Sequence, residues 1–152
     1  MKITICGSIA FFDQMQEIEK RLKSLGYLVK LPPHSIVDPS GDRVPIQENY
    51  KMRKTTSQND SWIWAAKQEV MREHLDKVMW ADVVLVLNYD KDGIKNYIGA
   101  NALLEMGLAF YHRKKIYLLN PIPEISYKEE ILAMHPTVIH GNLLQIQLMR
   151  QQ

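Results

Sequence analysis

The stretch VVLVLN at residues 83–88 decides the fold. Its five consecutive aliphatic side chains, three of them valines, are typical of a strand that is buried on both faces of a sheet. Asp82 precedes the run, and the polar loop YDKDGIKN at 89–96 follows it. Strands buried on both faces lie in parallel sheets covered by helices, so this stretch predicts an α/β domain.

The segments on both sides of this strand alternate between strand and helix patterns. Short β-rich runs predict strands, and apolar residues recurring every three or four positions predict helices. Gly26 and the proline pair after residue 31 end the first helix and the second strand. We expect strands at 2–6, 27–31, 83–88, 116–120 and 137–139, and helices at about 15–25, 61–80, 99–112, 127–134 and 143–149.

Five strands that alternate with helices predict a single doubly wound, flavodoxin- or Rossmann-like domain over residues 1–152. The usual strand order for such a parallel sheet is 2-1-3-4-5, and its ligand crevice lies at the carboxyl ends of strands 1 and 3. The Gly7-Ser8 turn should therefore face the loop at 88–99. The polar segment at about 32–60 is too long for an ordinary connection and is interpreted as an insertion or flap.

Composition excludes several classes of function. A formal net charge of +2 does not favour a nucleic acid polymer or a membrane as partner. The apolar start of the chain lacks the cleavage site of a secretory signal, and the single Cys6 fits a reducing compartment, so we expect a cytoplasmic protein. We interpret Cys6 as core packing, and the basic cluster of Lys51, Arg53 and Lys54 as a solvated loop.

Glu105 is the candidate catalytic residue. It lies four residues after Asn101, and therefore on the same face, in an otherwise apolar helix that starts at the expected crevice. A buried carboxylate is costly unless it has a partner or faces a cleft, so the alternative is a structural pairing with a core cation. Gly107 in mid-helix suggests that another backbone or a ligand comes close to it.

Other candidate residues surround the same crevice. Gly7, Ser8 and Ile9 offer backbone N–H groups and a hydroxyl to an anion or a sugar, although a simple tight turn explains them too. Asp90 belongs to a turn from which it can reach the crevice. The five histidines are scattered without metal-ligand spacing, so we expect neither a metal nor a cofactor, and we interpret His74 as a partly exposed helix residue.

The motifs ICGSI at 5–9, Asp82 before the central strand, and LLEMGLAF at 103–110 resemble the nucleoside 2-deoxyribosyltransferase family, which includes the 2'-deoxynucleoside 5'-monophosphate N-glycosidases. The resemblance implies a doubly wound α/β fold and a homo-oligomer in which a neighbour helps to complete the site. It implies that Glu105 is the nucleophile that attacks the anomeric carbon of the sugar. It also implies that Gly7, Ser8 and Ile9 line a pocket for a nucleoside or nucleotide.

Three positions differ from that family's pattern. His74, Gly99 and Asn101 stand where the family has an aspartate, an aspartate or serine, and a glycine. We expect His74 to act as an acid or to orient the nucleophile, and Gly99 and Asn101 to lie at the substrate. The expected function is cleavage or transfer at an N-glycosidic bond. The alternative is a non-catalytic nucleotide sensor that uses the same crevice.

Overall fold

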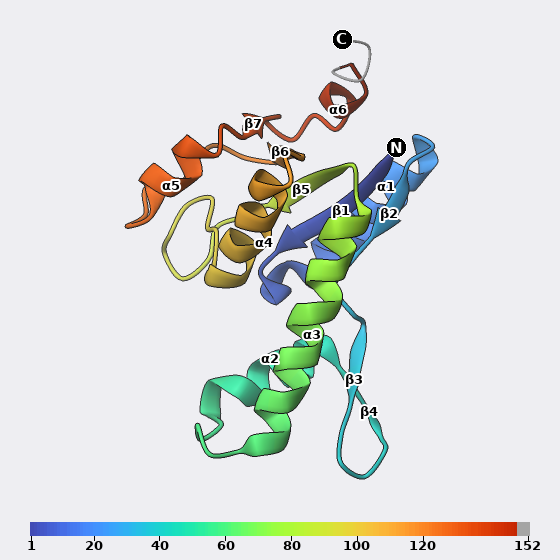
Figure 1. Cartoon of the computed structure of the whole chain (residues 1–152), viewed down its shortest axis with the longest axis vertical. Helices are drawn as coiled ribbons and strands as arrows, with labels where there is room; N and C mark the ends of the chain where they lie inside the picture. Colours follow the sequence, from blue (N-terminus) through green and yellow to red (C-terminus); the bar gives the residue numbers. More distant parts are fainter. Residues whose placement is uncertain (149–152) are drawn as a thin grey trace.

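The computed structural model describes residues 1–148 and contains a parallel sheet of five strands (Figure 1). Strand β5 is central and buried along its whole length, as the sequence predicts. The observed order β2-β1-β5-β6-β7 confirms the predicted order 2-1-3-4-5, because β5, β6 and β7 are the third, fourth and fifth strands of this sheet. The strands are β1 (Lys2–Gly7), β2 (Leu28–Lys30), β5 (Val83–Leu87), β6 (Lys115–Leu118) and β7 (Thr137–Val138).

Helices cover both faces of the sheet, as in a doubly wound fold. The 3-10 turn η1 (Ile9–Phe11) leads into α1 (Phe12–Ser24), which packs on one face together with α6 (Leu144–Leu148). The other face carries α3 (Ser61–Trp80), α4 (Ala100–Tyr111) and α5 (Lys128–Ala133). Met149 of the predicted last helix lies outside the described residues. Within residues 1–148, no helix combines the length and the apolar character needed to cross a membrane.

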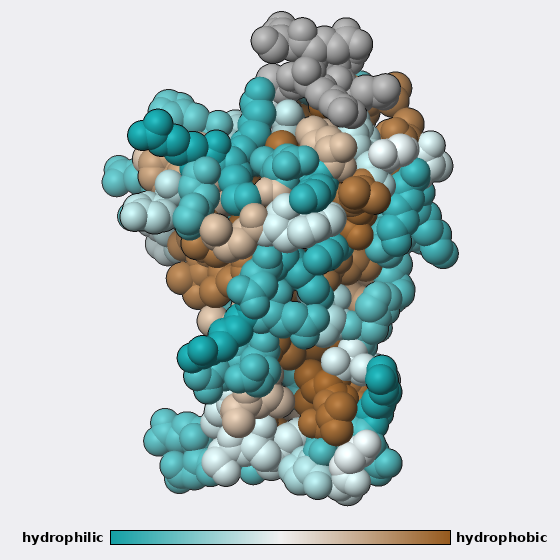
Figure 2. All heavy atoms as spheres, turned by 45° about the vertical axis from the view of Figure 1, so that its right-hand side comes forward, coloured by the Kyte–Doolittle hydropathy of each residue, from teal (hydrophilic) through white to brown (hydrophobic). Residues whose placement is uncertain are grey.

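The segment predicted as a flap has regular structure of its own. Strands β3 (Ser35–Val37) and β4 (Arg43–Pro45) form an antiparallel hairpin, and α2 (Ile46–Thr55) follows it. We call residues 35–55 the arm. Figure 1 shows the arm and the first half of α3 projecting from one end of the sheet, and Figure 2 shows hydrophobic patches between the polar side chains of this part. Two arm residues, Ile36 and Ile46, are buried in the same apolar cluster as α1.

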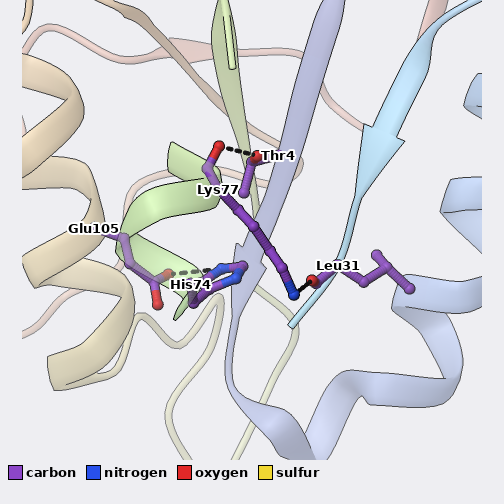
Figure 3. Close-up of polar contacts among 5 residues, drawn as sticks. All are labelled: Thr4, Leu31, His74, Lys77 and Glu105. Carbon is purple, nitrogen blue, oxygen red and sulfur yellow. Dashed lines mark hydrogen bonds and ion pairs between the residues drawn. The ribbon is translucent and has the colours of Figure 1, made fainter. Parts of the chain in front are cut away.

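The carboxyl half of α3 is tied to the sheet by polar contacts (Figure 3). The Thr4 hydroxyl on β1 donates a 2.7 Å hydrogen bond to the Lys77 carbonyl, and Lys77 Nζ donates a 2.9 Å bond to the Leu31 carbonyl after β2. Lys77 Nζ also lies 2.8 Å from Glu73 Oε1. These contacts fix the position of the helical turn that carries His74.

The Thr4 contact predicts a measurable effect on stability. Thr4→Val keeps the shape of the side chain but removes one of the two donors to the Lys77 carbonyl, which keeps only the 3.1 Å bond from the Ala81 N–H, so we expect a loss of about 1 kcal/mol in the free energy of unfolding. Urea denaturation of both proteins measures this difference. An unchanged midpoint would show that the helix does not depend on this bond.

Candidate active site

A pocket of about 220 Å³ opens at the carboxyl ends of β1 and β5, where the fold rule places a ligand crevice. The turn at Gly7 and Ser8 forms one side, and the start of α4 forms the other, so the turn faces the loop after the central strand as predicted. The lining residues are Gly7, Ser8, Ile9, Pro32, Tyr50, Arg53, Lys67, Val70, Met71, His74, Lys91, Tyr97, Gly99, Ala100, Asn101, Ala102 and Glu105.

Glu105 and His74 meet at the floor of this pocket. Glu105 comes from the middle of α4 and His74 from α3, and Figure 3 shows the two side chains pointing toward each other. The distance from His74 Nε2 to Glu105 Oε2 is 3.6 Å. Only 4% of His74 and 8% of Glu105 is exposed. The structure therefore places His74 inside, against the expectation of a partly exposed residue, because α3 lies across the pocket.

Burial makes this pair electrically neutral in the absence of a ligand. Desolvation raises the pKa of the Glu105 carboxyl to about 8, although the Cys6 thiol and the Lys67 ammonium oppose the rise. Desolvation also lowers the pKa of the His74 imidazole to about 3, with a further contribution from the Lys77 charge. At neutral pH the carboxyl group is therefore mostly protonated beside a neutral imidazole. A positive charge that develops on a molecule bound in the pocket would favour the ionised form of Glu105 over the protonated form.

The Gly7-Ser8 turn is shaped by tight packing. Gly7 has a φ of +151°, and a Cβ atom there would lie 2.8 Å from the Leu87 carbonyl oxygen and 3.1 Å from Met15 Cε. The Ser8 Oγ accepts a 3.3 Å hydrogen bond from the Ala10 N–H and so caps η1. The Ser8 hydroxyl also interacts with the Tyr50 hydroxyl, so these two side chains form one polar edge of the pocket.

A wall of positive charge faces the floor, and sequence reasoning missed it. Arg53 from α2, Lys67 from α3 and Lys91 from the loop after β5 line the pocket, and none of them makes an ion pair with another described residue. Burial and the Arg53 charge lower the pKa of Lys67 to about 8. Among the described lining residues, Glu105 is the one acid. The wall is suited to an anion.

The position of Arg53 corrects the interpretation of the basic cluster as a solvated loop. The basic cluster lies in helix α2 and not in a loop. Lys51 and Lys54 are exposed as expected, but Arg53 lines the pocket, and its buried Nε has no hydrogen-bond partner. The Arg53 guanidinium and the Lys91 ammonium lie 5.7 and 5.2 Å from the Tyr50 ring centre. The spacing of Lys67 and His74, seven residues apart and therefore on one face of a helix, is the signal that could have found Lys67.

Three further expectations have different outcomes. Asp90 does not line the pocket, because its Oδ1 accepts a 2.9 Å hydrogen bond from the Asn96 N–H inside its own loop. No other backbone of the described chain approaches Gly107, because a Cβ atom there would have no heavy atom within 4 Å outside the nearby backbone of its own helix, whereas the approach of a ligand to Gly107 stays a prediction. Gly99 and Asn101 do line the pocket, and Gly99 leaves room for the Tyr97 ring.

Comparison with known proteins gives matches in structure alone. No protein-family model matches the sequence, and no curated protein matches it. The fold is similar to a 2-deoxyribosyltransferase from Bacillus psychrosaccharolyticus, with a TM-score of 0.48 and 17% identity over 78% of this chain and 71% of that one. It is also similar to the CMP N-glycosidase BcmB of Clostridium botulinum, with a TM-score of 0.45 and 15% identity over 91% and 85% of the two chains.

A third similar structure is a conserved protein from Enterococcus faecalis, with a TM-score of 0.47 and 16% identity over 100% of this chain and 87% of that one. All three are likenesses of fold.

The outer face of α4 is apolar and exposed. Leu104 and Tyr111 are 54% and 78% exposed, and Gly107 lies between them on the same face. Isolated exposed apolar residues are ordinary, but a row along one helix fits a contact surface. The homo-oligomer implied by the resemblance stays a prediction, and this face of α4 is the surface that suits it.

Proposed function

We propose that the protein cleaves the N-glycosidic bond of a nucleoside or nucleoside 5'-monophosphate, or transfers its sugar, with Glu105 as the nucleophile. The observation that carries the proposal is a buried carboxyl group at the floor of a pocket whose opposite wall is positively charged. A structural carboxyl group would be paired with a core cation. Glu105 instead contacts a neutral histidine and the Cys6 thiol, and its Oε2 makes no hydrogen bond.

The chemical step uses the carboxylate twice. Departure of the base gives the sugar oxocarbenium character, and a carboxylate beneath it stabilises this charge and forms an ester with the anomeric carbon. The Glu105 carboxyl first releases its proton to water; the C–N bond electrons then leave with the base, which takes up a proton from water. Water then attacks the same carbon and frees Glu105, which makes the enzyme a hydrolase, or a second base does so, which makes it a transferase.

His74 is suited to position Glu105. The ring is neutral, and its Nε2 lies 3.6 Å from the carboxyl oxygen. Because burial lowers the pKa of His74 to about 3 and raises the pKa of Glu105 to about 8, the ring does not take up the carboxyl proton. We therefore propose His74 as the residue that positions Glu105, in the place where the resembled family has an aspartate.

The positive wall favours a substrate that carries a phosphate. Arg53 presents an unpartnered Nε, and Lys67 is a partly desolvated ammonium in the same pocket. A phosphate group would supply the missing acceptor and the missing opposite charge. The Ser8 and Tyr50 hydroxyls add neutral polar groups to the same pocket. We therefore propose the 5'-monophosphate as the preferred form of the substrate.

Removing the charges of the wall tests this preference. We expect Arg53→Met and Lys67→Met each to raise KM for a nucleoside 5'-monophosphate by about 10- to 100-fold, since hydrogen bonds to charged groups contribute about 1.5–3 kcal/mol. The KM for the matching nucleoside should change little. Lys51→Met, an exposed position on the same helix, is the control. Equal losses for the nucleoside and the nucleotide would contradict a phosphate at this wall.

A substrate panel tests the proposed function itself. Nucleosides and their 5'-monophosphates are incubated with the protein, and free base is measured by chromatography, with a second base added to detect transfer. Release or exchange of a base supports the proposal. The presence of His74 in place of an aspartate favours the second candidate, a nucleotide sensor. Saturable binding by calorimetry, with no base released from any compound, would support the sensor and reject the enzyme.

A further inference from the structure

Three metal-binding types of side chain meet at the pocket floor. Cys6 from β1, His74 from α3 and Glu105 from α4 each offer a ligand atom, and these atoms all lie within 4.8 Å of one another. Their exposed fractions are 0%, 4% and 8%. No spacing motif announces this cluster, because three separate elements bring its members together. The interpretation of Cys6 as packing alone therefore overlooks its neighbours.

The Cys6 thiol interacts with the Glu105 carboxyl, but three other polar atoms of this cluster lack partners. Neither ring nitrogen of His74 nor Oε2 of Glu105 makes a well-formed hydrogen bond, although all three atoms are buried. The backbone of Ile5 lies close enough to favour a protonated ring but not in good hydrogen-bond geometry. Buried polar atoms are nearly always paired, so this arrangement points to a bound group that completes it.

We propose that Cys6, His74 and Glu105 bind a zinc ion at the floor of the pocket. Thiolate, imidazole and carboxylate are the three side-chain ligands of Zn²⁺, at about 2.3, 2.0 and 2.1 Å. A tetrahedron with these bonds separates its ligand atoms by about 3.3–3.7 Å, so side-chain shifts of about 1 Å close the site. His74 and Glu105 line the pocket, which leaves the fourth position open toward it.

The charges of such a site balance. Binding releases the protons of the Cys6 thiol and the Glu105 carboxyl to solvent, and the resulting two negative charges match those of Zn²⁺. The neutral His74 ring would coordinate the metal through the lone pair of one nitrogen. The N–H of its other nitrogen is then available to the Ile5 backbone, and a backbone group is a usual outer partner of a metal-bound histidine. The positive charge of Lys67 acts on Glu105 and would repel a metal ion bound there.

Because Lys67→Met removes this repulsion, the substitution should tighten zinc binding.

The metal has a consequence for the reaction. Glu105 cannot bind zinc and attack a sugar at the same time, so zinc should act as an inhibitor that competes with the substrate. This consequence rests on the proposed function, whereas zinc binding itself does not. The distinction allows the two ideas to be tested separately.

Cobalt titration of the full chain tests the site without any assay of activity. Co²⁺ takes zinc sites and gives a thiolate charge-transfer band in the near ultraviolet together with intense tetrahedral bands in the visible. Because the chain has one cysteine, such a band reports Cys6 ligation directly. We expect one equivalent of Co²⁺ to produce both features and Zn²⁺ to abolish them. Their absence in the wild-type protein would overturn the proposal.

Variants locate the remaining ligands. Cys6→Ser and His74→Gln should each weaken zinc binding by at least about 100-fold, judged by competition with a chelating dye. His112→Gln, an exposed histidine at the end of α4, should leave binding unchanged. Circular dichroism checks that each variant is folded. Wild-type affinity in a folded Cys6→Ser or His74→Gln variant would overturn the proposal, and the wild-type cobalt spectrum decides it if a variant does not fold.

Measurements of base release separate this proposal from the proposed function. If the chelated protein releases base, saturating zinc should stop the reaction and chelation should restore it. A thiolate band in a protein that never releases base would reject the proposed function and keep the metal site. Undiminished base release at saturating zinc would reject the metal site and keep the proposed function.

Discussion

Glu105→Gln is expected to lower the rate of base release by at least about 1,000-fold, because the amide cannot form an ester with the sugar. Glutamine has nearly the same size and shape as the glutamic acid that burial favours here. The pocket should therefore keep its form, and the dissociation constant for a nucleoside 5'-monophosphate should change by less than about tenfold. A loss in kcat without a matching loss of binding is the signature of a group that acts on the reacting atoms.

The same measurements distinguish a nucleophile from a structural carboxyl group. Glu129→Gln, an exposed position on α5, is the matched control and should retain full activity. Single-turnover kinetics and calorimetric binding separate the chemical step from affinity. A Glu105→Gln protein that keeps more than a tenth of wild-type turnover would remove Glu105 from the chemistry.

Gly7→Ala is expected to cause the second large effect, on folding and on the pocket together. A φ of +151° is strained for alanine, and its methyl group would meet the Leu87 carbonyl oxygen at 2.8 Å. Strained backbone and overpacking together cost about 2–5 kcal/mol. Thermal and urea unfolding should show this loss. Folded protein should bind nucleotide more weakly, because relief of the clash moves the turn that carries Ser8.

A second glycine provides the control for this substitution. Gly107 lies inside α4, has no positive φ, and has open space where a Cβ atom would be. Gly107→Ala should therefore raise the free energy of unfolding by about 0.5–1 kcal/mol. If both variants were destabilised alike, the special geometry of the Gly7 turn would not be the reason.

The sheet could be predicted because its signals are local. The run at 83–88 and the other short apolar runs indicate strands by composition alone, and the parallel connection rules then supply their order. The position of the crevice follows from that order. Glu105 and Asn101 could be found as polar residues on an apolar helix, and the Gly7-Ser8 turn as a breaker after a strand.

The rest of the site depends on contacts between distant segments. Arg53 reads as a solvated residue because nothing near it in sequence shows that α2 lies beside the pocket. The depth of His74 is set by α3 crossing the sheet, which the bonds of Lys77 to Thr4 and Leu31 maintain. The meeting of Cys6 with Glu105 requires β1 and α4 to be neighbours. Local periodicity carries none of this information.

The hydrogen bonds that hold α3 to the sheet lie near the carboxyl end of that helix, and this arrangement affects how the pocket can change in evolution. Lys77 secures the turn of His74 to the sheet, whereas Lys67 lies nearly three turns earlier, toward the arm that supplies Arg53. The proposed nucleophile and the proposed phosphate contacts therefore belong to separately supported parts of the molecule. A new hairpin or a shifted α2 could alter which anions are accepted while the reacting groups keep their places.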